Sequence, residues 1–183
     1  MEKFIRKVIT PSLSRGFTLV ELLIVIALLG ALAIGLIGAL DPFEQLKKGT
    51  DTGTRNNVSE THSAFIRYYA LKGYMPWCDA DGVCADLTTP TALSDDIFSA
   101  ADTGVLAKVV ASGELKDTFT KVNEGDLAKI WITGTAMQAI VCYQPTSKSF
   151  RSDKNTKYAK DGTDQIDPAC GTTDLTACYW CVR

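Results

Sequence analysis

The chain has 183 residues, of which 46% are hydrophobic and 22% are charged, and its net charge at pH 7 is −2. This length allows one modest globular domain with an appendage, and the composition is ordinary for a chain that folds. Residues 1–16 carry four basic side chains and one acidic one, so the rest of the chain has a net charge of −5. An acidic chain of this kind argues against nucleic acid as a partner.

A long apolar segment follows the basic N-terminus. Residues 17–40 contain one ionisable side chain, Glu21, and one other polar side chain, Thr18. As a helix this segment would reach about 36 Å, against about 30 Å for the hydrocarbon core of a bilayer. Four basic residues precede it and none follows before Lys47. This bias predicts a single-pass protein of the cytoplasmic membrane, with its N-terminus in the cytoplasm and the rest outside.

The candidate cleavage point lies before the apolar segment, whereas a secretory signal is cleaved after its apolar core. A peptidase acting at Gly16 would remove the basic leader and leave the apolar segment on the mature chain. Residues 15–26 read Arg-Gly-Phe-Thr-Leu-Val-Glu-Leu-Leu-Ile-Val-Ile. This stretch closely resembles the class III leader of type IV pilins and type II secretion pseudopilins.

The resemblance implies a maturation and assembly pathway. A membrane prepilin peptidase would cut between Gly16 and Phe17 and methylate the new Phe17 amine. The mature helix would then leave the bilayer and join identical and related pilin subunits on an inner-membrane assembly platform. The product would be a cell-surface or periplasmic filament.

Glu21 is the candidate residue for register in such a filament. An ionisable group inside a membrane helix is costly, so it usually has a functional partner. Glu21 lies about one turn from the Phe17 amine and would face the amine of a neighbouring subunit in a staggered bundle. The alternative is that Glu21 only sits near the headgroups at a helix N-terminus, where the helix dipole favours an anion.

Small residues recur every four positions in the apolar segment and would let neighbouring helices approach closely: Ala27, Ala31, Gly35 and Ala39. The alternative is that alanine and glycine are simply common in membrane helices. Many relatives carry a proline midway along this segment, which this chain lacks. Local melting on assembly is therefore expected at Gly35 and Gly38 or at the Asp41-Pro42 step.

A second helical pattern follows Pro42, with its apolar residues on one face: Val58, His62, Phe65 and Tyr69, with Ile66 beside them. We expect a kink or break at residues 49–53 and a helix end at Gly73. The predicted fold class is α+β, a pilin-like lollipop in which a long N-terminal transmembrane helix packs on a small antiparallel β-sheet head. The expected divisions are a leader (1–16), a transmembrane and assembly helix (17–40), its amphipathic continuation (41–72) and a globular head (73–183).

Within the head, the sequence predicts a short helix at residues 103–112 that ends at Gly113. Residues 129–133 and 137–143 are rich in Ile, Val and aromatic side chains and predict an antiparallel hairpin. A last short strand is expected at 147–151. The tail after Lys154 is expected to be loop-like.

Six cysteines lie beyond the apolar segment, and an even count outside the cytosol indicates disulfides: Cys78, Cys84, Cys142, Cys170, Cys178 and Cys181. Cys78 and Cys84 are expected to pair locally, which leaves three connectivities for the other four. Cys178 and Cys181 also have zinc-ligand spacing, but no second such pair exists and the lone His62 is on a helix.

Acidic loop residues offer oxygen ligands for calcium: Asp79, Asp81, Asp161, Asp164 and Asp167. Pseudopilins resembling this chain often hold calcium in a C-terminal loop. Neither run matches a full calcium-loop motif, and turn formation by Asp and Gly explains both more simply. No other cofactor is expected, and no catalytic constellation is present, which argues against an enzyme.

The expected function is that of a structural subunit of a type IV pilus-like filament. The first alternative is a major pseudopilin of a type II secretion system. The second is a membrane-anchored surface binding module that never polymerises.

Overall fold

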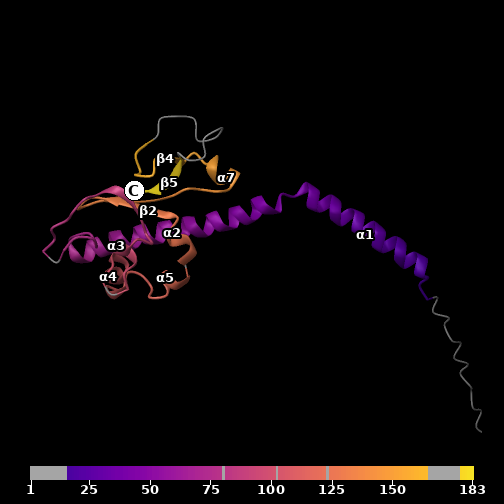
Figure 1. Cartoon of the computed structure of the whole chain (residues 1–183), viewed down its shortest axis with the longest axis horizontal. Coiled ribbons are helices and arrows are strands. Elements are labelled where there is room, and N and C mark those ends of the chain that lie inside the picture. The colour runs from indigo at the N-terminus through magenta and orange to yellow at the C-terminus, as the bar shows by residue number, and fades with distance from the viewer. Residues whose placement is uncertain (1–15, 80, 102, 123, 165–177) are drawn as a thin grey trace, which may run out of the picture. The chain divides into compact units, whose positions relative to one another are not determined.

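The computed structural model describes residues 16–79, 81–101, 103–122, 124–164 and 178–183 (Figure 1). The chain divides into two compact units, with the boundary after Pro42.

The first unit contains one helix, α1 (Leu19–Ala39), which is long and apolar enough to cross a membrane. It ends at Leu40, whose backbone is extended (φ −99°, ψ 132°). Pro42 disfavours helix at the residue before it, so the helical pattern is interrupted at residues 40–41. Gly35 and Gly38, by contrast, lie within uninterrupted helix.

The second unit begins with the helix α2 (Pro42–Lys72). Proline at the first helical position fits because its missing N–H would have no intrahelical partner there. The predicted break at residues 49–53 is wrong, because helix continues through both glycines. Asp51 and Thr54 are buried, and the hydrogen bonds that Asp51 accepts from the head favour helix in this stretch. The predicted end is confirmed, with Gly73 in the left-handed region (φ 81°).

The buried face of α2 differs by about one position from the predicted face. Val58 and Phe65 are buried as expected, but their buried neighbours are Thr61, Ala64 and Tyr68. His62 and Tyr69 are half-buried, and Ile66 is 40% exposed. The sequence pattern favoured the more hydrophobic side chains, whereas packing against the head selected the small and polar ones in the same stripe.

A five-stranded antiparallel sheet has the order β1-β2-β3-β5-β4. Its strands are β1 (Leu87–Ala92), β2 (Ile130–Gly134), β3 (Ala139–Tyr143), β4 (Thr156–Tyr158) and β5 (Tyr179–Val182). The predicted hairpin is confirmed as β2 and β3, in the register Ile130 opposite Tyr143 and Gly134 opposite Ala139. The predicted α+β class, with a long N-terminal helical region and a small antiparallel sheet, is likewise confirmed.

Short helices fill the connections: α3 (Asp96–Ser99), α4 (Val105–Ala111), α5 (Phe119–Val122), α6 (Glu124–Leu127) and α7 (Lys148–Arg151). The helix expected at 103–112 is α4, and Gly113 follows it with φ 83°. The strand expected at 147–151 is wrong, because α7 occupies this stretch and the N–H groups of Ser147 and Lys148 donate to carboxylates of α2. The expectation of a loop-like tail after Lys154 is wrong where the chain forms the strands β4 and β5.

The core lies between α2, the sheet and the short helices (Figure 1). The Phe65 ring contacts Trp77 edge-on at 5.8 Å and stacks on Phe98 at 6.4 Å. Alternate residues of the hairpin, Ile130, Ile132, Val141 and Tyr143, complete this core. The head is therefore held by apolar packing on the C-terminal part of α2.

Candidate processing and assembly helix

The candidate cleavage residues lie at the start of the described chain and are exposed. Phe17 is 84% exposed. A side chain at Gly16 would meet no atom within 4 Å. Gly16 and Phe17 therefore stand clear of the rest of the described chain.

Thr18 and Glu21 form a reciprocal hydrogen-bonded cap at the start of α1. The backbone N–H and the hydroxyl of Thr18 donate to Glu21 Oε2, at 2.8 and 2.7 Å. The backbone N–H of Glu21 donates back to Thr18 Oγ1 at 3.2 Å. This capping box satisfies N–H groups that the first turn of a helix leaves without partners. This role of Thr18 was not predicted from the sequence, although the Thr-x-x-Glu spacing indicates it.

The side chains of α1 are all exposed. None of its 21 residues is buried. The small residues Ala27, Ala31, Gly35 and Ala39 are all exposed, and their four-residue spacing places them along one side of the helix. An apolar surface of this extent is stable only in lipid or against other protein.

The cysteines form structural cross-links in the head. Cys78 bonds to Cys84, the pairing favoured by the sequence, and Cys142 bonds to Cys181. Cys142 and Cys181 face each other in the register of β3 and β5. The sequence analysis could not select this pair because it did not predict β5. Cys178 is also disulfide-bonded, and Cys170 lies outside the described residues.

The acidic loop residues act as turn and ion-pair groups. Asp79 accepts hydrogen bonds from the N–H groups of Asp81 and Val83. Asp161 accepts from the N–H and hydroxyl of Thr163, which hold its pKa below the ordinary value. Asp164 forms an ion pair with Lys157 at 3.0 Å. Asp167 lies outside the described residues, among which no cluster of three His, Cys, Asp or Glu has metal-binding geometry.

His62 lies in the head, on α2. Burial lowers its pKa, and a hydrogen bond with the Ala139 backbone acts in the opposite direction. The folded head therefore favours the neutral ring, so its contribution to stability is present above the unfolded pKa and is lost as pH falls below about 6.5. This environment is that of a packed structural histidine.

A family model described as the prokaryotic N-terminal methylation motif matches residues 11–37. This chain carries the N-terminal methylation motif of type IV pilins and pseudopilins. The motif covers the candidate cleavage point, the capping box and most of α1. It implies processing by a prepilin peptidase and assembly with other pilin subunits. No curated protein and no solved structure matches the chain.

Proposed function

We propose that this chain is a structural subunit of a type IV pilus-like filament. The observation that carries the proposal is the match of the methylation motif to a helix that buries none of its own residues. A helix that bears this leader and leaves its whole apolar surface uncovered is suited first to a bilayer and then to a bundle of like helices. The role is structural and not catalytic.

In the proposed pathway, cleavage between Gly16 and Phe17 frees an amine at the start of the mature chain, which is then methylated. Glu21 lies four residues further on and carries the single charge of α1. In a filament its carboxylate faces the Phe17 amine of a neighbouring subunit. Because the pair joins two chains in an apolar bundle, it fixes the axial position of one subunit against the next.

The capping box offers a way to separate this role from simple helix capping. Glu21→Gln removes the charge but keeps a side chain that still completes a capping box. Thr18→Ala keeps the charge but removes the hydroxyl that accepts from the Glu21 N–H. We predict that Glu21→Gln lowers the yield of sheared filaments well over tenfold. Thr18→Ala is expected to lower it about fivefold or less, since a lost cap costs about 1 kcal/mol.

The measurement is the amount of mature chain in sheared filaments, relative to its amount in the membrane fraction of the same cells. Equal membrane levels of the three proteins show that insertion is unaffected. Wild-type filament yield from Glu21→Gln would contradict the pairing role. A larger loss of filament from Thr18→Ala than from Glu21→Gln would mean that Glu21 acts only in the helix cap.

A further inference from the structure

The two halves of α2 are held to the head in different ways. From Val58 onward the helix buries mainly apolar side chains, whereas the buried residues before Val58 are the polar Asp51 and Thr54. Residues 42–50 are all described, and none of them is buried. Since local stability follows buried apolar contact, the N-terminal half of α2 is expected to open more readily than the C-terminal half.

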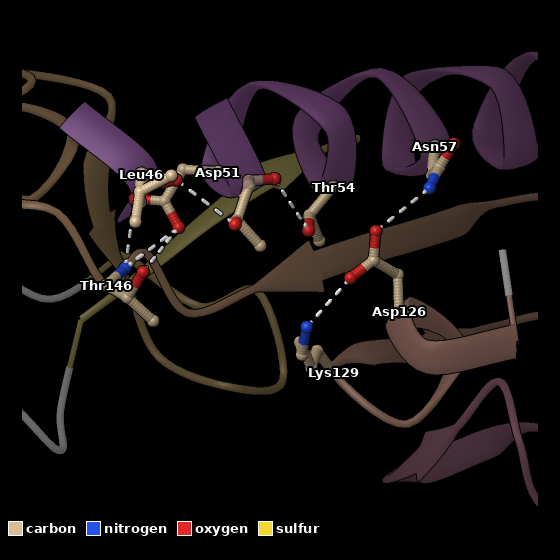
Figure 2. Close-up of polar contacts among 8 residues, drawn as sticks. Leu46, Asp51, Thr54, Asn57, Asp126, Lys129 and Thr146 are labelled. Carbon is tan, nitrogen blue, oxygen red and sulfur yellow. Dashed lines mark hydrogen bonds and ion pairs between the residues drawn. The ribbon is translucent and has the colours of Figure 1, made fainter. Parts of the chain in front are cut away.

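The polar half also contains a stretch of low helix propensity. Residues 49–54 read Gly-Thr-Asp-Thr-Gly-Thr, and both glycine and β-branched threonine are poor helix formers. Each threonine hydroxyl here donates to the carbonyl four residues earlier: Thr50 to Leu46 (3.2 Å), Thr52 to Lys48 (2.8 Å) and Thr54 to Thr50 (3.1 Å), two of them drawn in Figure 2. Such bonds slightly destabilise and bend helices.

A single buried carboxylate ties this stretch to the head. Asp51 is 2% exposed and accepts the backbone N–H of Thr146 at 3.0 Å to Oδ1 and 3.1 Å to Oδ2 (Figure 2). It also accepts the Thr146 hydroxyl at 2.9 Å and the Ser147 N–H at 2.7 Å. Hydrogen bonds to a carboxylate are stronger than neutral ones, and a buried donor left without a partner is costly. These donors therefore favour the helical state that places Asp51 against them.

We propose that residues 49–54 form a hinge in α2, and that Asp51 sets its helical state. The C-terminal side of the hinge is anchored, since Arg55 pairs with Asp153 at 3.2 Å and the apolar core begins at Val58. When Asp51 leaves its donors, the helix opens at the hinge while the core from Val58 onward stays folded.

The part of α2 before the hinge presents apolar side chains to its surroundings. Phe43 and Leu46 are 74% and 69% exposed, and Glu44 accepts a hydrogen bond from the Lys148 N–H of the head. In a filament, bending at the hinge would let the part of α2 before it pack against a neighbouring subunit while the head stays folded. That use depends on the proposed function, but the hinge itself is a property of the single subunit.

Alanine at both glycines gives the first test. Neither glycine has an atom within 4 Å of an added Cβ, so Gly49→Ala/Gly53→Ala changes helix propensity without a clash. Each replacement raises the equilibrium constant between the helical and the open state about fivefold. Hydrogen exchange of the mature chain, monomeric in detergent micelles, is followed by mass spectrometry. We expect amides 50–55 to exchange faster than amides 62–70 in the wild type, and the variant to slow amides 50–55 about 25-fold and leave amides 62–70 unchanged.

Asp51→Asn gives the opposite test. It places an amide against donor groups, and we expect it to speed exchange of amides 50–55 about tenfold or more, with amides 62–70 changed far less. Asp126→Asn is the matched control, because Asp126 contacts Asn57 at 3.4 Å and Lys129 at 2.8 Å, beyond the hinge (Figure 2). It should leave amides 50–55 at the wild-type rate.

Two results would overturn the hinge. One is equal protection of amides 50–55 and 62–70 in the wild type, with no change in the alanine variant. The other is an Asp51→Asn protein in which both sets of amides speed up equally, since Asp51 would then stabilise the whole head. The alanine variant remains decisive if Asp51→Asn fails to fold. The protein is monomeric in this experiment, so a failure of filament assembly does not affect the outcome.

Discussion

At the cleavage point, the proposed processing depends on a residue without a side chain. Gly16 stands clear of the described chain, so substitution there leaves the head and α1 undisturbed. We predict that Gly16→Ala is cleaved at nearly the wild-type rate and Gly16→Arg at less than about a hundredth of it. The reason is that a peptidase active site shaped for a backbone without a side chain excludes a bulky group, which raises the barrier by about 3 kcal/mol or more.

The measurement is the intact mass of the protein from membranes, which reports whether residues 1–16 are present. Gly16→Ala serves as the control for expression and insertion. Accumulation of fully cleaved Gly16→Arg protein would mean that the leader is not processed as the motif implies.

The residues at this end of the molecule were accessible from sequence because their chemistry is local. Gly16, Phe17 and Glu21 stand out by their order around an apolar segment, and no tertiary contact is needed to find them. Asp51 could not be found in this way. Asp51 accepts hydrogen bonds from Thr146 and Ser147, about 95 positions later in the chain, and nothing in the local sequence indicates that contact.

At the scale of elements, the sequence predicted those whose own pattern is strong. The apolar helix α1, the helix α4 and the hairpin of β2 and β3 each follow from an uninterrupted pattern, which ends before Pro42 in α1 and at a glycine in α4 and β2. The failures occur where distant contacts outweigh local preference. Helix persists through residues 49–53 because the head holds Asp51, and β5 forms because it pairs with β3 and β4.

The disulfides allow a prediction about how these elements are joined. Cys142–Cys181 closes a sequence separation of 39 residues, and Cys78–Cys84 closes one of 6. Chain entropy predicts that removing the first bridge by Cys142→Ala/Cys181→Ala costs about 4 kcal/mol of unfolding free energy, and removing the second by Cys78→Ala/Cys84→Ala costs about 2 kcal/mol. Urea unfolding of the mature chain in detergent, without reductant, measures both.

Each double variant is the control for the other, because both replace two cysteines by alanine. Equal losses of unfolding free energy in the two variants, or a larger loss in Cys78→Ala/Cys84→Ala, would contradict this prediction. The bridge between β3 and β5 would then not be what holds the end of the chain in the sheet. Equal slopes of the unfolding transitions are needed for the comparison.

At the scale of the whole molecule, the chain combines a membrane-length helix that has no buried residue and a head with its own core and disulfides. The head folds around a buried apolar core of its own, whereas the apolar surface of α1 requires lipid or other protein around it. The disulfide between strands suits the extracytoplasmic location that the filament proposal gives to the head, outside the reducing cytosol.

The most direct test of the filament proposal is non-reducing mass spectrometry of filaments sheared from cells, with the membrane fraction measured in parallel. We predict abundant chain that begins at methylated Phe17 in the sheared filaments, with Cys78–Cys84 and Cys142–Cys181 peptides. Mature chain confined to the membrane fraction would contradict a pilus subunit and favour a pseudopilin. A chain that retains residues 1–16 and never appears in filaments would contradict both and indicate a simple membrane anchor.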